Sequence, residues 1–153
     1  MLADHPPLLV LTITTLVAGV GAILPFSPAE PLLVGIAAVT KPWLLVPMIA
    51  FATVSSMVAK TLVYEGSGKV ERALSPRKRA LLERMRSRLA GRRGLQIATV
   101  FLSATCGLPP FYLVTLVCGA LRLPIADYLL AGTTGRAVRF SAIMMLPQLF
   151  ATA

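Results

Sequence analysis

The sequence predicts an all-α integral membrane protein, built as an inverted repeat of two re-entrant helical hairpins that are each followed by a transmembrane helix. Three observations lead to this prediction: an apolar composition, two apolar blocks separated by one basic segment, and a proline motif that occurs once in each block. Of the 153 residues, 56% are hydrophobic and only 14% are charged, and the mean hydropathy is +0.79. This composition is too apolar for a soluble domain of this size.

The first element is an apolar run at residues 8–24, which follows the N-terminal stretch MLADHPP. That stretch carries no Lys or Arg, and no small-residue cleavage site introduces a soluble domain after the run, so we expect the run to be retained rather than removed as a secretory signal. Two arrangements stay open for it. Its 17 residues are at the lower limit for a complete span, and the alternative is the first half of a hairpin.

Each apolar block contains the same arrangement of residues. The first block has LPFSPAEPLLVGIAAVTKP at 24–42, and the second has LPPFYLVTLVCGALRLP at 108–124. Both begin with Leu-Pro, place a glycine ten residues after that proline, and continue with one basic residue and another proline before a longer apolar run. The corresponding residues are Pro25, Gly35 and Lys41 in the first block and Pro109, Gly119 and Arg122 in the second. We interpret the two stretches as an internal repeat with structural glycines.

Proline explains why each apolar block is interrupted. It lacks a backbone donor and disfavours helix in the preceding residue, so each motif marks a break between two half-helices. Irregular backbone is tolerated in a membrane where protein or a water-filled cavity covers it, which favours re-entrant hairpins whose tips enter from opposite faces and meet near the midplane. Secondary transporters commonly use discontinuous helices in inverted repeats as their binding sites. The expected hairpin tips are Pro25, Pro28, Pro109 and Pro110.

One basic segment separates the two blocks. Ten of the 15 Lys and Arg residues fall between Lys69 and Arg93, and the positive-inside rule places such a loop in the cytoplasm. This distribution accounts for the net charge of +9 without a nucleic-acid partner. We therefore expect one multi-pass domain in a bacterial-type inner (plasma) membrane, with a first hairpin and span at 8–64, a basic cytoplasmic amphipathic segment at 65–95, and a second hairpin and span at 96–152.

Within the basic segment, SPRKRALLERMRSRLAG predicts a helix with Ser75 as its N-cap, Pro76 at its first position and Gly91 just past its end. Its apolar residues share one face and its arginines take the other, which favours a helix that lies on the anionic inner leaflet. The alternative is a solvated loop that only sets the topology. The apolar residues are Leu81, Leu82, Met85 and Leu89.

Charged side chains within apolar sequence are the candidate site residues. A charge at the centre of a spanning helix costs about 2.5–3.5 kcal/mol on insertion scales, so such groups usually face a partner inside the protein. We assign substrate or lipid binding, or gating, to Glu30, Lys60, Arg122, Arg136 and Arg139. Glu30 is interpreted either as a proton-responsive carboxylate or as the end of a capping box in the run SPAE.

Arg136 and Arg139 lie three residues apart on one predicted helix face, near the middle of the last span. Two guanidinium groups there suit a phosphate headgroup, because the planar fork binds its oxygens bidentately. The alternative is that TTGR breaks the helix and both arginines extend to an interface. For Lys60, four residues before Tyr64, extension to the interface is the favoured interpretation.

Other motifs exclude function classes. EGSGKV is not a phosphate-binding P-loop, because Val70 stands where Ser or Thr is required and Val63 where the first glycine belongs. His5 is the single histidine, so we expect no metal site, and no Ser, His and Asp set or carboxylate pair suggests an active site. Cys106 and Cys118 have neither CxxC nor zinc spacing. We expect a protein that is not an enzyme and needs no cofactor.

The stretches PFSPAEP, KTLVYEGSG and GLPPFYLVTLVCGALRLPIADYLLAGTTGRAVRF resemble the two halves of the DedA family, also called the SNARE-associated or VTT-domain family, over residues 18–140. The resemblance implies facing re-entrant hairpins and a role in membrane lipid handling: bacterial members are linked to undecaprenyl phosphate recycling and the proton-motive force, and eukaryotic relatives to phospholipid scrambling. Glu30 matches the acidic residue of the first proline motif, Tyr64 the tyrosine that ends the following span, and Gly119 the glycine of the second hairpin.

The chain departs from this family at charged positions. Ala18 and its neighbours stand near a second acidic position, Cys106 and Tyr112 replace two arginines, and Lys60 replaces a common aspartate. We therefore expect a short, divergent member that acts as a lipid translocase or scramblase-like transporter for an anionic (poly)isoprenyl phosphate or phospholipid. Its partners would be membrane lipids with anionic headgroups, and a homodimer is compatible with its size. The alternatives are an ion-coupled small-solute transporter and a non-transporting membrane scaffold.

Overall fold

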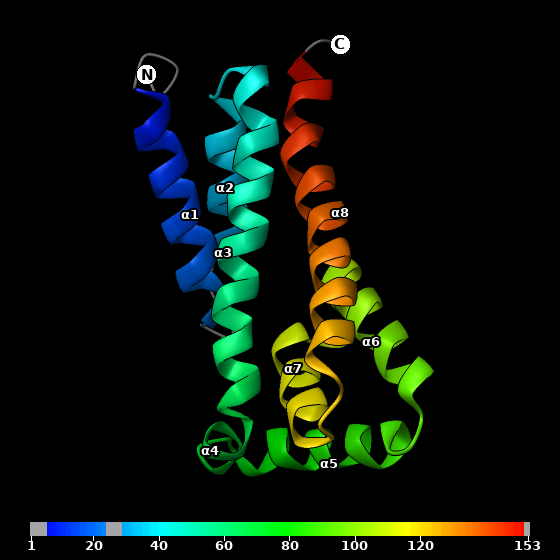
Figure 1. Ribbon diagram of the computed structural model, residues 1–153. Helices are drawn as coiled ribbons and strands as arrows, with labels where there is room; N and C mark the ends of the chain where they lie inside the picture. Colours follow the sequence, from blue (N-terminus) through cyan, green and yellow to red (C-terminus); the bar gives the residue numbers. More distant parts are fainter. Residues whose placement is uncertain (1–5, 24–28, 152–153) are drawn as a thin grey trace. The chain divides into compact units, whose positions relative to one another are not determined.

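The computed structural model describes residues 6–23 and 29–151, and within these ranges the fold is all-α, with eight α-helices, one short 3-10 helix and no strand (Figure 1). The predicted all-α class is confirmed. In chain order the helices are α1 (Pro7–Ile23), α2 (Ala29–Ala38), η2 (Pro42–Leu44), α3 (Leu45–Glu65), α4 (Ser67–Arg72), α5 (Pro76–Leu89), α6 (Arg93–Cys106), α7 (Phe111–Ala120) and α8 (Ile125–Ala151).

The helix order repeats along the chain. A helix of intermediate length, a ten-residue helix and a long helix occur as α1, α2 and α3, and again as α6, α7 and α8. In each half the first two helices pack against each other, α1 against α2 and α6 against α7. The ten-residue helices are those that begin after the two proline motifs.

The predicted break at the second proline motif is confirmed. Helix α6 ends at Cys106, and Gly107 then adopts a left-handed conformation with φ of 80°, which a glycine tolerates without steric cost. The Leu108–Pro109 peptide bond is cis, and α7 starts immediately after Pro110. The tip residues of the first motif, Pro25 and Pro28, lie outside the described residues.

The chain forms two compact units. The first unit comprises Met1–Ala59 and Arg136–Ala153, and the second comprises Lys60–Gly135. These units differ from the predicted halves at 8–64 and 96–152, because α3 and α8 each contribute residues to both units. Each unit therefore contains one proline-interrupted helix pair and parts of both long helices.

Each unit has its own apolar core. In the first unit, α1, α2, α3 and the C-terminal part of α8 contribute buried side chains, among them Val10, Leu33, Met48 and Met144. In the second unit, the core joins the end of α3 to α5 and α7, with Val63, Leu82, Leu89, Leu116 and Val117.

Helix α5 begins and ends where the sequence predicts. Ser75 is the N-cap, Pro76 opens the helix, and Gly91 has a positive φ of 70° just beyond its end. The interpretation of its apolar face is wrong, however, because Leu82 and Leu89 are buried in the core that α5 shares with α7. The apolar face of α5 therefore covers α7 instead of entering lipid, and only Leu81 of the predicted set is exposed.

One helix within the described ranges is long and apolar enough to cross a membrane, judged by length and composition alone. It runs from Pro42 to Glu65 over 24 residues, and slightly under half of its most apolar stretch is buried. Helix α8 is longer, with 27 residues, but carries Asp127, Arg136 and Arg139. Helix α1 has 17 residues, so both arrangements predicted for the N-terminal run stay open.

Candidate functional site

The first unit brings together three of the predicted site residues, Glu30, Arg136 and Arg139. Glu30 stands in the first turn of α2, and both arginines lie on α8. Arg139 donates from Nε to Glu30 Oε1 at 2.7 Å and from Nη2 to Oε2 at 2.5 Å, across 109 positions of sequence. Arg136 Nη1 lies 4.0 Å from Oε1 of the same carboxylate.

The regular geometry of α8 explains why both arginines reach one carboxylate. Residues three apart on an α-helix are neighbours on its surface. Helix α8 continues without interruption through TTGR, so the two arginines lie on one helix as predicted, and the alternative of a helix break at this sequence is wrong. Gly135 allows the helix to pack there: a Cβ at this position would lie 2.7 Å from the Ala104 Cβ and 2.8 Å from the Phe101 carbonyl oxygen.

The contact between Arg139 and Glu30 is the strong bidentate form of an arginine–carboxylate pair. Two parallel charge-assisted hydrogen bonds fix the guanidinium in the plane of the carboxylate. The side chains are partly buried, at 39% exposed for Glu30, 20% for Arg139 and 13% for Arg136. Two cations against one anion leave the cluster with a surplus of one positive charge.

Two observations concern the alternative interpretations of this cluster, in which Glu30 caps a helix and the arginines extend to an interface. Both carboxylate oxygens of Glu30 face a guanidinium, while the Ser27 half of the proposed capping box lies outside the described residues. The Arg136 guanidinium also lies 5.7 Å from the centre of the Phe140 ring, a distance at which a cation and a ring attract. In the described residues, then, the two arginines are held inside the unit by Glu30 and Phe140.

Lys60 belongs to the second unit and is buried, at 3% exposed. Its ammonium lies 5.1 Å from the centre of the Tyr112 ring and 5.8 Å from that of Phe111, both in the first turn of α7. The interpretation that Lys60 extends to an interface is therefore wrong. Tertiary contact with α7 provides ring faces that attract the cation and lie far from it in sequence.

Two buried tyrosines of the second unit, Tyr64 on α3 and Tyr128 on α8, contact each other through their rings, and sequence reasoning missed this contact in part. The rings of Tyr64 and Tyr128 lie 4.9 Å apart, the Tyr64 hydroxyl donates to the Leu123 carbonyl, and the Tyr128 hydroxyl lies 2.9 Å from Thr115 Oγ1. The sequence points to Tyr64 only through the family resemblance. No sequence signal singled out Tyr128 or Thr115, because their pairing depends on the packing of α7 against α8.

The two glycines of the repeat have different surroundings. A Cβ on Gly119 would lie 2.6 Å from the Tyr64 carbonyl oxygen and 2.9 Å from Ser67, so this position requires a glycine for close packing of α7. At Gly35, no atom beyond its own stretch of helix backbone lies within 4 Å of the corresponding point, so no close approach requires glycine there.

The remaining predicted cation, Arg122, is exposed in the connection between α7 and α8. Its backbone has a φ of 54°, which is uncommon for a side chain other than glycine, asparagine or aspartate. Arg122 belongs to the second unit, so the structure gathers Glu30, Arg136 and Arg139 into one cluster and leaves Lys60 and Arg122 in the other unit.

A further ion pair was not predicted. Arg93 Nε donates to Asp127 Oδ2 at 2.6 Å, which joins the start of α6 to the first turn of α8. The hydrogen bond to this carboxylate raises the pKa of Arg93 above its usual range. Among the described residues, no group of three or more His, Cys, Asp or Glu side chains could hold a metal ion.

Comparisons with protein-family models, with curated proteins and with solved structures gave no match for this chain. The resemblance to the DedA family therefore stays a prediction from the quoted residues.

Proposed function

We propose that this protein is a multi-pass membrane protein that moves an anionic lipid, an isoprenyl phosphate or a phospholipid, across the bilayer through the cluster of Glu30, Arg136 and Arg139. The observation that carries the proposal is the bidentate grip of Arg139 on the Glu30 carboxylate, with Arg136 beside it. A carboxylate and a phosphate present two oxygens to a guanidinium in the same way, so Glu30 occupies the position that a lipid phosphate would take.

Exchange of these two anions gives a simple transport cycle. A lipid phosphate displaces the Glu30 carboxylate from Arg139, and Arg136 supplies the second cation. Release of the phosphate returns the Glu30 carboxylate to Arg139. In this cycle the protein is not an enzyme, because no covalent bond of the lipid changes.

The proposed membrane architecture is an inverted repeat of two re-entrant hairpins, α1 with α2 and α6 with α7, each followed by a long helix. The repeated helix order, the break at Pro109 and the apolar Pro42–Glu65 helix support it. So do large apolar side chains on helix surfaces, such as Leu8 at 77% exposed and Val46 at 74% exposed, because monomeric soluble proteins rarely expose contiguous apolar patches. The basic segment at 65–95 would face the cytoplasm.

The deciding experiment measures lipid translocation in liposomes that carry the purified full-length protein, with undecaprenyl phosphate and with a labelled phospholipid. We expect translocation above empty liposomes, and a loss of at least tenfold in the Arg136→Leu/Arg139→Leu variant, because roughly 1.4 kcal/mol of lost phosphate binding corresponds to a factor of ten. Glu30→Gln should also block the cycle. Glu83→Gln, on the exposed surface of α5, is the matched control and should behave as wild type.

The conservative variant Arg139→Lys separates charge from geometry. Lysine keeps the positive charge and loses the planar fork, so we expect intermediate activity with weakened lipid binding. If folded protein moved neither lipid, or if the double arginine variant kept full activity, the proposal would be overturned. Uptake of a small solute driven by an ion gradient would then favour a solute transporter, and loss of function only on neutralising the Arg77–Arg93 cations would favour a scaffold.

A further inference from the structure

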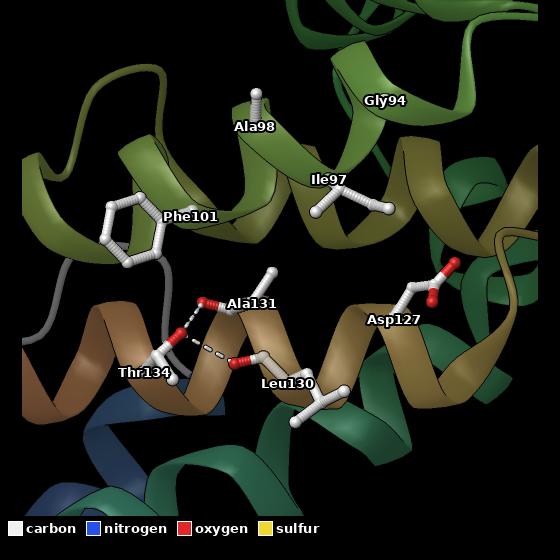
Figure 2. A pocket seen from close by; sticks show the side chains of 8 residues that line it. All are labelled: Gly94, Ile97, Ala98, Phe101, Asp127, Leu130, Ala131 and Thr134. Carbon is white, nitrogen blue, oxygen red and sulfur yellow. Dashed lines mark hydrogen bonds between the residues drawn. The ribbon is translucent and has the colours of Figure 1, made fainter.

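An open groove runs between α6 and the N-terminal half of α8, within the second unit (Figure 2). Its volume is about 490 Å³, within the roughly 300–1,000 Å³ that is usual for sites of small organic ligands. The lining is mostly small or apolar, from Gly94, Ile97, Ala98 and Phe101 on α6 and from Asp127, Leu130, Ala131 and Thr134 on α8. Leu130 is 68% exposed beside it.

The Thr134 hydroxyl in the groove lining is satisfied within its own helix. Thr134 Oγ1 donates to the Leu130 carbonyl at 2.7 Å and lies 3.1 Å from the Ala131 carbonyl oxygen, as the dashed lines in Figure 2 show. The groove therefore makes little demand for a polar occupant along most of its length. An apolar chain suits it.

One end of the groove is charged. Asp127 lies there, paired with Arg93, and Arg92 directly precedes Arg93 at the N-terminus of α6. Two cations against one carboxylate leave one positive charge over, and the N-terminal turn of a helix adds partial positive charge from its backbone N–H groups. This end belongs to the basic segment at 65–95, while the opposite end, at Phe101 and Thr134, carries no ionisable side chain among the lining residues.

We propose that this groove binds an anionic glycerophospholipid from the surrounding leaflet, with one acyl chain between α6 and α8 and the phosphate at Arg92 and the start of α6. Charge complementarity selects the occupant: an apolar trough with a cationic end fits an amphiphile with an anionic head. The inference rests on the membrane location in the proposed function, but not on transport at Glu30. The site would hold a lipid beside the second hairpin.

The test places a fluorescent reporter in the groove of the full-length protein in nanodiscs. Trp43 is the single tryptophan, so Trp43→Phe combined with Phe101→Trp puts the only tryptophan in the groove lining. Two sets of nanodiscs are compared, one with brominated phosphatidylglycerol and one with brominated phosphatidylcholine at the same mole fraction. Quenching of the tryptophan fluorescence by the brominated acyl chains reports which lipid occupies the groove. One surplus basic charge near the surface predicts about fivefold enrichment of phosphatidylglycerol over phosphatidylcholine, which high salt should reduce.

Two matched pairs of variants locate the effect. Ala98→Phe fills the groove and should remove the enrichment, while Ala50→Phe, on an exposed surface of α3, should leave it. Arg92→Gln should lower the enrichment severalfold, while Arg77→Gln, exposed in the first turn of α5, should leave it unchanged.

Equal quenching by the two lipids, or the same result for Ala98→Phe and Ala50→Phe, would overturn the proposal. Weak quenching by both lipids together with crosslinking between copies at Ala98 would assign the groove to a second copy of the chain and also overturn it. Because this readout involves no transport, enrichment in a protein that moves no lipid would support the groove and contradict only the proposed function.

Discussion

The two units each hold a cation at the first turn of a short helix, but with different side chains. In each, the ten-residue helix after a proline motif presents its first turn to a cation from a long helix. In the first unit that turn carries Glu30, and the cations are Arg136 and Arg139. In the second unit it carries Phe111 and Tyr112, and the cation is Lys60.

The difference separates architecture from chemistry in this repeat. Prolines and the helix order recur in both halves, whereas the partner of the cation does not. Another anion can displace the Glu30 carboxylate from a cation, whereas the Phe111 and Tyr112 rings carry no negative charge that an anion could replace. The anion-exchange chemistry proposed for this protein is therefore available in the first unit, and the aromatic contacts of the second unit are suited to holding a buried cation in place.

The largest change in the free energy of unfolding is expected at the two glycines of the repeat. Gly119→Ala should lower the free energy of unfolding by about 2–3 kcal/mol, because its Cβ would meet backbone 2.6 Å away and overpacking costs about 1–3 kcal/mol. Gly35→Ala should instead raise stability by about 0.5–1 kcal/mol, because the site is open and alanine favours helix. Denaturation in detergent measures both. If both substitutions changed the free energy of unfolding in the same direction, the two glycine positions would be equivalent and this prediction would be wrong.

The Glu30–Arg139 pair should give the next largest effect. Arg139→Leu removes two hydrogen bonds and leaves a carboxylate without its bidentate partner, and we expect a loss of about 1–2 kcal/mol, at the low end for a paired charge because Glu30 is 39% exposed. Adding Glu30→Gln should then cost little.

A double-mutant cycle over these two positions measures the interaction directly. Because Glu30→Gln should cost little once Arg139 is leucine, the coupling energy should equal in size the cost of Glu30→Gln in the wild-type protein. Additive effects would mean that the two side chains do not interact in the folded protein, and would remove the geometric support for anion exchange.

The smallest effect is expected for the second unit's cation. Lys60→Met removes the attraction to the Phe111 and Tyr112 rings but also removes the cost of burying a charge, so the net change in the free energy of unfolding should stay below about 1 kcal/mol. Lipid translocation should be retained. A variant that folds and loses transport would show that Lys60 takes part in the site, and would weaken the contrast between the units.

Local sequence signals predicted the helices well. The cis Leu108–Pro109 bond itself was not foreseen, but the break it lies in follows from proline chemistry that acts on adjacent residues. Ser75, Pro76 and Gly91 likewise bounded α5 because caps act within one turn. By contrast, the apolar face of α5 was assigned to lipid, and it packs on α7, because a periodic pattern shows that a face is buried without showing against what.

The sequence by itself determined the apolar helical class, the repeat, the helix boundaries at prolines and glycines, and the placement of Arg136 and Arg139 on one helix face. Only the tertiary structure decided their partner. Glu30 lies 109 residues from Arg139, and Lys60 meets rings some 50 positions away, so no local propensity encodes either contact. Helix formation depends on neighbours within a turn, whereas the chemistry of a buried charge depends on whichever side chain the packing brings to it.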